Sequence, residues 1–267
     1  MEIFRRVSGR HTSIIGIFVF LFGLFGSFGP FESTLYAQNK QGRIHRGMDV
    51  PVDPSGNMET ETTDEDWPDE EDPPVFYDED VPIQKGLTYV IDMSGSMVYN
   101  TSKYINEHGA VQMGSRFERA KTELIKSVLT LSEKYIFNII AFNCSQRICF
   151  PTRVHATEAN KQKAIQWIQA IRQPDGSTGT APAVLKALRE EDDTIILLTD
   201  GEPSRCIGWD FVDERGDTLP IHEQAIIAGC QAKGVKCHAF GIQDYGAFRD
   251  FLMKIASATG GNYTHIE

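Results

Sequence analysis

The segment Leu87–Met97, LTYVIDMSGSM, decides the fold. Its short apolar run ends at Asp92, and two serines then flank Gly95. An apolar run of this length, bounded by turn residues, is typical of a buried strand in a parallel sheet. Ligands bind at the carboxyl ends of such strands in open α/β sheets. We therefore expect Asp92, Ser94 and Ser96 on a loop at that edge, where their oxygen atoms suit a small hard cation such as Mg²⁺.

Two later segments supply further oxygen atoms. A second apolar run, Thr194–Thr199, ends at Asp200 and Gly201. Between the two runs lies a glycine-rich loop that contains Thr178 and leads into a helix with Pro182 in its first turn. Both segments are expected at the same edge of the sheet as Asp92.

Together these residues resemble the metal-ion-dependent adhesion site of von Willebrand factor type A domains. The pattern there is Asp-x-Ser-x-Ser, followed by Thr and then by Asp. All five positions match, and the resemblance covers Ile83–Glu267. The matching residues are Asp92, Ser94, Ser96, Thr178 and Asp200.

The resemblance also implies a role for each of these residues. Ser94 and Ser96 would bind the cation directly, Asp92 and Asp200 would act largely through coordinated water, and Thr178 would bind it in the ligand-competent state. Neutral hydroxyls donate less charge than carboxylates, so a position on the cation stays open for an Asp or Glu carboxylate of a partner protein. The cofactor is expected to be Mg²⁺, with Mn²⁺ or Ca²⁺ as alternatives.

After Gly86, strand and helix patterns alternate along the chain, which is typical of a doubly wound α/β sheet with helices on both faces. The resemblance implies six mostly parallel strands in the order 3-2-1-4-5-6, with one short antiparallel edge strand. The strands that end at Asp92 and Asp200 would then be neighbours. The remaining strands are expected at 136–142, 147–150, 235–242 and 262–266, and the helices at 116–133, 158–171, 182–189, 221–232 and 245–258.

The N-terminal residues 1–37 have the pattern of an export signal. Three arginines precede the apolar run Ile14–Phe28, which is shorter than the roughly 20 residues that span a membrane. We expect cleavage after Ala37, with retention as a membrane anchor as the alternative. Either way the protein would be exported, to the periplasm, the cell surface or the medium.

Residues 38–82 are expected to form a disordered acidic linker. Asp49–Asp80 contains 14 Asp and Glu residues and no Lys or Arg. Its charge of −14 is larger in magnitude than the net charge of −11 of the whole chain. Such a segment cannot bury enough apolar surface to offset its ordering entropy. As an alternative, its carboxylates could occupy the metal site of the same chain. The expected domain, 83–267, is close to neutral, and this gives no electrostatic case for nucleic-acid binding.

Five cysteines are too few for a disulfide-dense scaffold, and no spacing fits a zinc site. Cys144 and Cys149 flank an expected hairpin turn and could pair in an oxidising compartment. Cys237 lies inside an apolar strand pattern and is expected to be a small buried side chain.

Two long loops are expected to surround the metal. The first, Val98–Ser115, contains Tyr99 and Tyr104, and the second, Glu202–Pro220, contains Trp209 and Phe211. These aromatic residues would help to select the partner, or would instead pack back on the domain.

Two other function classes share parts of this sequence pattern. An apolar strand that ends in Asp also begins haloacid-dehalogenase-like phosphatases, with Asp92 as the nucleophile, but their general acid two positions later is here Ser94. We therefore expect no enzymatic activity. Type A domains also occur in intracellular chelatase and ATPase-partner subunits, an interpretation that would gain weight if residues 1–37 did not direct export.

Overall fold

The computed structural model describes residues 73–172, 174–190, 193–206 and 218–267. The predicted export signal, most of the predicted acidic linker, and Trp209 and Phe211 lie outside these ranges. Within them, no helix has the length and apolar character needed to cross a membrane.

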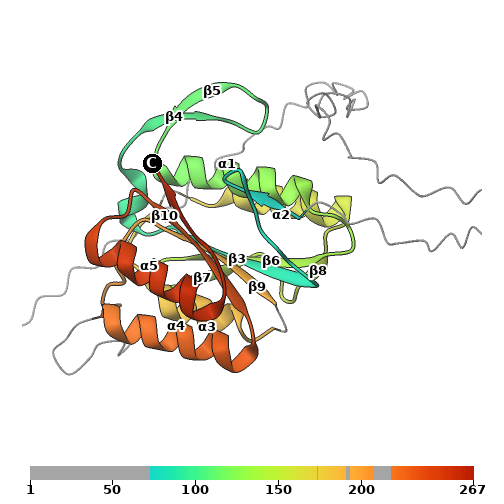
Figure 1. The fold of residues 1–267 in the computed structure, drawn as a ribbon. Coiled ribbons are helices and arrows are strands. Elements are labelled where there is room, and N and C mark those ends of the chain that lie inside the picture. The colour runs from blue at the N-terminus through green and yellow to red at the C-terminus, as the bar shows by residue number, and fades with distance from the viewer. Residues whose placement is uncertain (1–72, 173, 191–192, 207–217) are drawn as a thin grey trace, which may run out of the picture. The chain divides into compact units, whose positions relative to one another are not determined.

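A seven-stranded sheet forms the centre of the domain (Figure 1), in the order β11-β10-β9-β3-β6-β7, with β8 also paired to β6. Neighbouring strands run parallel from β11 to β6, whereas β7 and β8 are antiparallel to β6. The strands are β3 (Gly86–Asp92), β6 (Ile136–Phe142), β7 (Gln146–Ile148), β8 (Val154–His155), β9 (Thr194–Thr199), β10 (Lys236–Ile242) and β11 (Tyr263–Ile266). The mixed α/β fold with a mostly parallel sheet is confirmed. The count of six strands is wrong, because Val154 and His155 return to pair with the start of β6.

Helices cover both faces of this sheet (Figure 1). One face packs against α1 (Arg116–Thr130) and α2 (Glu158–Ala170), and the other against α3 (Thr180–Ala187), α4 (Leu219–Lys233) and α5 (Gly246–Thr259). In β3, Leu87, Tyr89 and Ile91 belong to the first core and Val90 to the second. Successive side chains of a strand point to opposite faces, so a strand covered on both sides becomes the continuous apolar run seen in the sequence.

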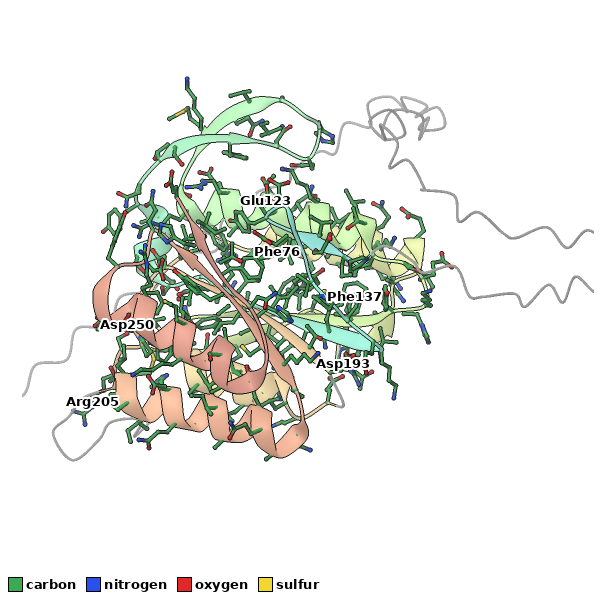
Figure 2. All side chains as sticks on the ribbon, in the orientation of Figure 1. Phe76, Glu123, Phe137, Asp193, Arg205 and Asp250 are labelled. Carbon is green, nitrogen blue, oxygen red and sulfur yellow. A yellow bond between two sulfur atoms is a disulfide. The ribbon has the colours of Figure 1, made fainter. Side chains whose placement is uncertain are left out.

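The packed domain also includes residues before Ile83, where the sequence analysis placed acidic linker. Val75–Phe76 (β1) and Glu79–Asp80 (β2) pair as a short hairpin. Phe76 is buried, and its ring lies 4.9 Å from that of Phe240 and 5.9 Å from that of Tyr89. Figure 2 shows Phe76 between α1 and the sheet. The buried side chains of Phe76 and Val81 anchor this segment, while its acidic residues stay at the surface.

The expected loop Val98–Ser115 is instead mostly regular structure. A 3₁₀ turn, η1 (Gly95–Val98), leads into a hairpin of β4 (Ser102–Ile105) and β5 (Val111–Gly114). Ser115 then caps α1 by a capping box with Glu118. The segment that carries Tyr99 and Tyr104 therefore begins at a 3₁₀ turn and ends at a capped helix.

Cys144 does not pair with Cys149, which the sequence leaves as a possibility, since it is bonded to Cys206, 62 residues away. The backbone N–H of Cys149 donates to the carbonyl of Ile139, and the Cys149 side chain packs against the first core. Strand pairing therefore directs the Cys149 thiol away from the turn. Cys237 is fully buried with a free thiol, as expected.

Candidate metal centre

Asp92 is the last residue of β3, and its side chain is fully buried. Its Oδ1 accepts a hydrogen bond from the Ser94 backbone N–H at 2.7 Å, and its Oδ2 accepts one from the Thr199 hydroxyl at 2.5 Å. The first bond folds the DxSxS loop back over the strand end, and the second ties the carboxylate to β9. Asp92 is thus held rigidly between two neighbouring strands.

The two serine hydroxyls continue from Asp92 towards Asp200. Ser94 Oγ lies 3.1 Å from Ser96 Oγ, and Ser96 Oγ donates to Asp200 Oδ1 at 2.7 Å. Asp200 directly follows β9, which is the neighbour of β3 in the sheet. Side chains 104 positions apart in the sequence are thereby brought into direct contact.

Thr178 lies on a third loop, which is positioned by backbone contacts. The N–H of Gly95 donates to the carbonyl of Gly176 at 2.9 Å, and the N–H of Gly179 donates to Asn143 at 3.0 Å. The N–H of Thr178 donates to Ser204 Oγ at 2.7 Å, while the N–H of Ser204 donates back to the Thr178 carbonyl at 2.9 Å.

The Thr178 hydroxyl borders the same small space as Ser96. A Cβ added to Gly201 would lie 3.2 Å from Ser96 Oγ and 3.8 Å from Thr178 Oγ1. Glycine at this position therefore leaves room beside the two hydroxyls. The five predicted side chains thus come together at the carboxyl ends of β3 and β9.

Two acidic groups lie close together in this site. Burial, together with the nearby charge of Asp200, raises the pKa of the Asp92 carboxyl to about 7, although the hydrogen bonds from Thr199 and Ser94 act in the opposite direction. A cation placed among these oxygens would favour the charged form of both carboxylates.

Asp200 has a cationic neighbour as well. Arg116 Nη1 lies 2.5 Å from Asp200 Oδ2, so one carboxylate oxygen faces the guanidinium and the other faces Ser96. Arg116 is itself held by a hydrogen bond from its Nε to Gln243 Oε1 at 2.9 Å.

The donor set fits a small hard cation. It consists of three hydroxyls and two carboxylates, which are the oxygen ligands that Mg²⁺, Mn²⁺ and Ca²⁺ prefer, and it contains no sulfur or imidazole. Over the described part of the chain, no group of three or more His, Cys, Asp and Glu side chains is placed to hold a metal. A site here would depend on serine and threonine oxygens.

Four aromatic residues were expected to surround the metal and are here called the rim: Tyr99, Tyr104, Trp209 and Phe211. Only Tyr99 and Tyr104 lie within the described ranges. Tyr99 is 65% exposed and Tyr104 is half-buried, with its hydroxyl donating to Gln112 at 2.8 Å. Sequence reasoning missed Arg116, Thr199 and Ser204. Thr199 could have been found, since it directly precedes Asp200 in a buried strand, but Arg116 and Ser204 act through tertiary contacts that leave no local pattern.

Comparison with known proteins identifies the domain. The family model for the von Willebrand factor type A domain matches residues 107–265, a range that contains Thr178 and Asp200 and begins after Ser96. The human von Willebrand factor A domain-containing protein 3A is 31% identical over 156 residues, which is 57% of this chain and 12% of that protein. The mouse inter alpha-trypsin inhibitor, heavy chain 4, is 31% identical over 143 residues, or 48% of this chain and 14% of the relative.

A solved structure, a von Willebrand factor type A protein from Catenulispora acidiphila, has the same fold. Its TM-score is 0.52 at 20% identity, over 69% of this chain and 39% of that one. The chain spans only about an eighth of the length of the two curated relatives. The family match covers more than half of the chain, and the structure has the corresponding sheet and helices. The chain therefore belongs to the von Willebrand factor type A domain family.

Proposed function

We propose that this protein is an exported, metal-dependent protein-binding module. Domains of this family generally mediate protein–protein interaction and metal-dependent adhesion, and their relatives are generally non-enzymatic interaction modules. The observation that carries the proposal is the contact between Ser96 Oγ and Asp200 Oδ1. Ser96 Oγ and Thr178 Oγ1 both lie beside Gly201. Oxygen donors from three separate loops thus converge at one edge of the sheet.

Each residue has a distinct part in this proposal. Ser94, Ser96 and Thr178 would hold the cation through neutral hydroxyls, whereas Asp92 and Asp200 would balance its charge and orient its bound water. A bound Mg²⁺, or Mn²⁺ or Ca²⁺ in its place, would supply an electron-poor centre with one position for a carboxylate oxygen from an Asp or Glu of the partner. Thr199 and Ser204 would position these ligands without binding the cation themselves.

The rim is proposed to select the partner. Tyr99 is exposed within three residues of Ser96, and its N–H donates to the Ser96 carbonyl at 3.2 Å. Tyr104 follows on the hairpin. Trp209 and Phe211 are proposed for the same role from the sequence alone, since they lie outside the described residues.

Export is proposed from residues 1–37, and the Cys144–Cys206 bond supports it because such bonds persist in oxidising compartments. Mass spectrometry of the protein recovered from its native source tests this part. A new N-terminus at Gln38 is expected. An intact N-terminus on a protein that remains in the cytoplasm would contradict export and favour an intracellular subunit.

Calorimetric titration of Mg²⁺, Mn²⁺ and Ca²⁺ into the metal-free protein tests the site. Asp200→Ala and Ser94→Ala should each weaken binding by about tenfold or more with the fold retained, since the first removes a carboxylate that balances the charge of the cation and the second removes a direct ligand. Asp250→Ala and Ser257→Ala, at exposed positions of α5, serve as controls and should bind like the wild type. Equal affinity in all five proteins would rule out the proposed site while leaving the fold assignment intact.

A further inference from the structure

We propose that Arg116 makes the metal-loaded site selective for anionic ligands; this inference rests on the proposed function. Arg116 is the first residue of α1, and its guanidinium lies 2.5 Å from Asp200 Oδ2. Only 12% of the Arg116 side chain is exposed, and the Asp200 side chain is 0% exposed. A charged pair so far removed from water interacts strongly and keeps its geometry.

The position of the guanidinium is built by residues from two other segments. Gln243 Oε1 accepts from Arg116 Nε at 2.9 Å and also from Asn100 Nδ2 at 2.8 Å. Asn100 and Gln243 have backbone φ angles of 56° and 50°, which non-glycine residues adopt at some cost in energy. Two unfavourable backbone conformations thus support one hydrogen-bonded bridge, and backbone strain of this kind gathers at functional sites.

The charge of the site follows from these groups. When Asp92 and Asp200 are both ionised, as a bound cation favours, their carboxylates and the guanidinium of Arg116 together carry one negative charge. The three hydroxyls add none. With a divalent cation the site therefore has a net charge of one positive unit, whereas without Arg116 it would be neutral. A net positive site attracts a carboxylate or another anion, and a neutral one does so less.

The same charge acts in the opposite direction on the cation. Arg116 repels an incoming cation and binds one oxygen of Asp200, so it should weaken metal binding while it strengthens binding of the anion that follows. A residue that merely holds Asp200 in place would behave differently, because its loss would weaken both steps. The sign of the two effects therefore separates the charge role from a structural one.

The experiment uses the full chain, with Mn²⁺ as the cation and acetate as the anionic probe. Calorimetry gives the Mn²⁺ affinity, and water-proton relaxation at bound Mn²⁺ reports acetate, because acetate displaces bound water. For Arg116→Gln we expect Mn²⁺ to bind roughly three- to tenfold tighter and acetate roughly three- to tenfold weaker, as for removal of one nearby charge. Arg116→Lys retains the charge and should keep both affinities within about threefold of the wild type.

The matched control is Lys126→Gln, which removes a charge from the same helix at the Glu123 ion pair. It should change neither affinity. Arg116→Met replaces Arg116→Gln if the latter does not fold, as judged by thermal unfolding. Weaker binding of both Mn²⁺ and acetate, or an unchanged acetate affinity, would overturn the role of Arg116. A wild-type protein that binds no Mn²⁺ would instead refute the proposed metal site itself.

Discussion

Carboxylates at the two edges of the central sheet have different hydrogen-bond partners. At the amino-terminal edge, the Asp193 carboxylate accepts hydrogen bonds from the backbone N–H groups of Gln84, Lys85 and Gly86 at 2.6–2.9 Å. Figure 2 shows Asp193 at this edge, just before β9. At the carboxyl edge, Asp92 and Asp200 lie close to each other, and each accepts a hydrogen bond from a hydroxyl.

The difference separates a structural carboxylate from a candidate ligand. Three backbone donors satisfy Asp193 and link the start of β3 to that of β9, so the charge stabilises the fold. Asp92 has one backbone donor, full burial and an acidic neighbour, so its charge is unfavourable until a cation compensates it. Residues that bind ligands commonly cost stability in the free protein.

The largest expected effect comes from the disulfide at the carboxyl edge. It closes a loop of 62 residues between the turn after β6 and the segment that carries Asp200. Replacing both Cys144 and Cys206 by serine should lower the free energy of unfolding by about 3–4 kcal/mol, because the unfolded chain regains freedom. Urea unfolding without reductant measures the loss.

Cys149→Ser is the control for this variant, since Cys149 carries a free, half-buried thiol. It should cost less than about 1.5 kcal/mol. A loss of less than about 1 kcal/mol in the double variant would show that other contacts suffice to hold this edge.

The next largest change in the free energy of unfolding is expected at Asp193, in contrast to Asp92. Asp193→Ala should lower the free energy of unfolding by about 2–3 kcal/mol, since three backbone N–H groups lose their acceptor, and should leave Mg²⁺ affinity unchanged. Asp92→Asn should change metal-free stability by less than about 1 kcal/mol, because it removes a repulsive charge at constant size.

Chemical unfolding with and without Mg²⁺ distinguishes these two variants. Mg²⁺ should stabilise the wild type and Asp193→Ala but not Asp92→Asn. If Asp92→Asn proved the more destabilising of the two in the absence of metal, the distinction between the edges would fail.

The smallest effect concerns pH and His222, which is buried and accepts a hydrogen bond at Nδ1 from the N–H of Ala181 in the first turn of α3. Burial lowers the pKa of His222 to about 4 from an unfolded value near 6.5. The unfolded state therefore binds the proton more tightly, so this contribution to stability is complete above pH 6.5 and is lost as the pH falls towards 4.

Between pH 7 and pH 5 this loss should amount to about 1–2 kcal/mol. His222→Gln keeps an acceptor for Ala181 but does not titrate, so the difference in unfolding free energy between wild type and variant should shrink over this interval. Parallel pH profiles of the two proteins would exclude His222 as the source.

The local pattern of the chain was sufficient for the central strands, for the five helices and for one loop of the site. Runs such as Thr194–Thr199 are buried on both faces, and only a central strand meets that condition. The Asp92–Ser96 loop could be predicted because its hydrogen bond from Ser94 N–H to Asp92 joins residues two positions apart. Such short-range contacts depend mainly on the local sequence.

Other features depend on contacts between distant segments. Three contacts join residues that are at least 62 positions apart in the sequence. They are the Cys144–Cys206 disulfide, the packing of Phe76 against Phe240, and the ion pair of Arg116 with Asp200. No periodicity or spacing encodes them, because they arise only when the parallel strands are placed side by side. The sequence by itself determined which residues could bind a cation, and the tertiary structure decided which charges surround them, because electrostatic interaction depends on distance in space rather than along the chain.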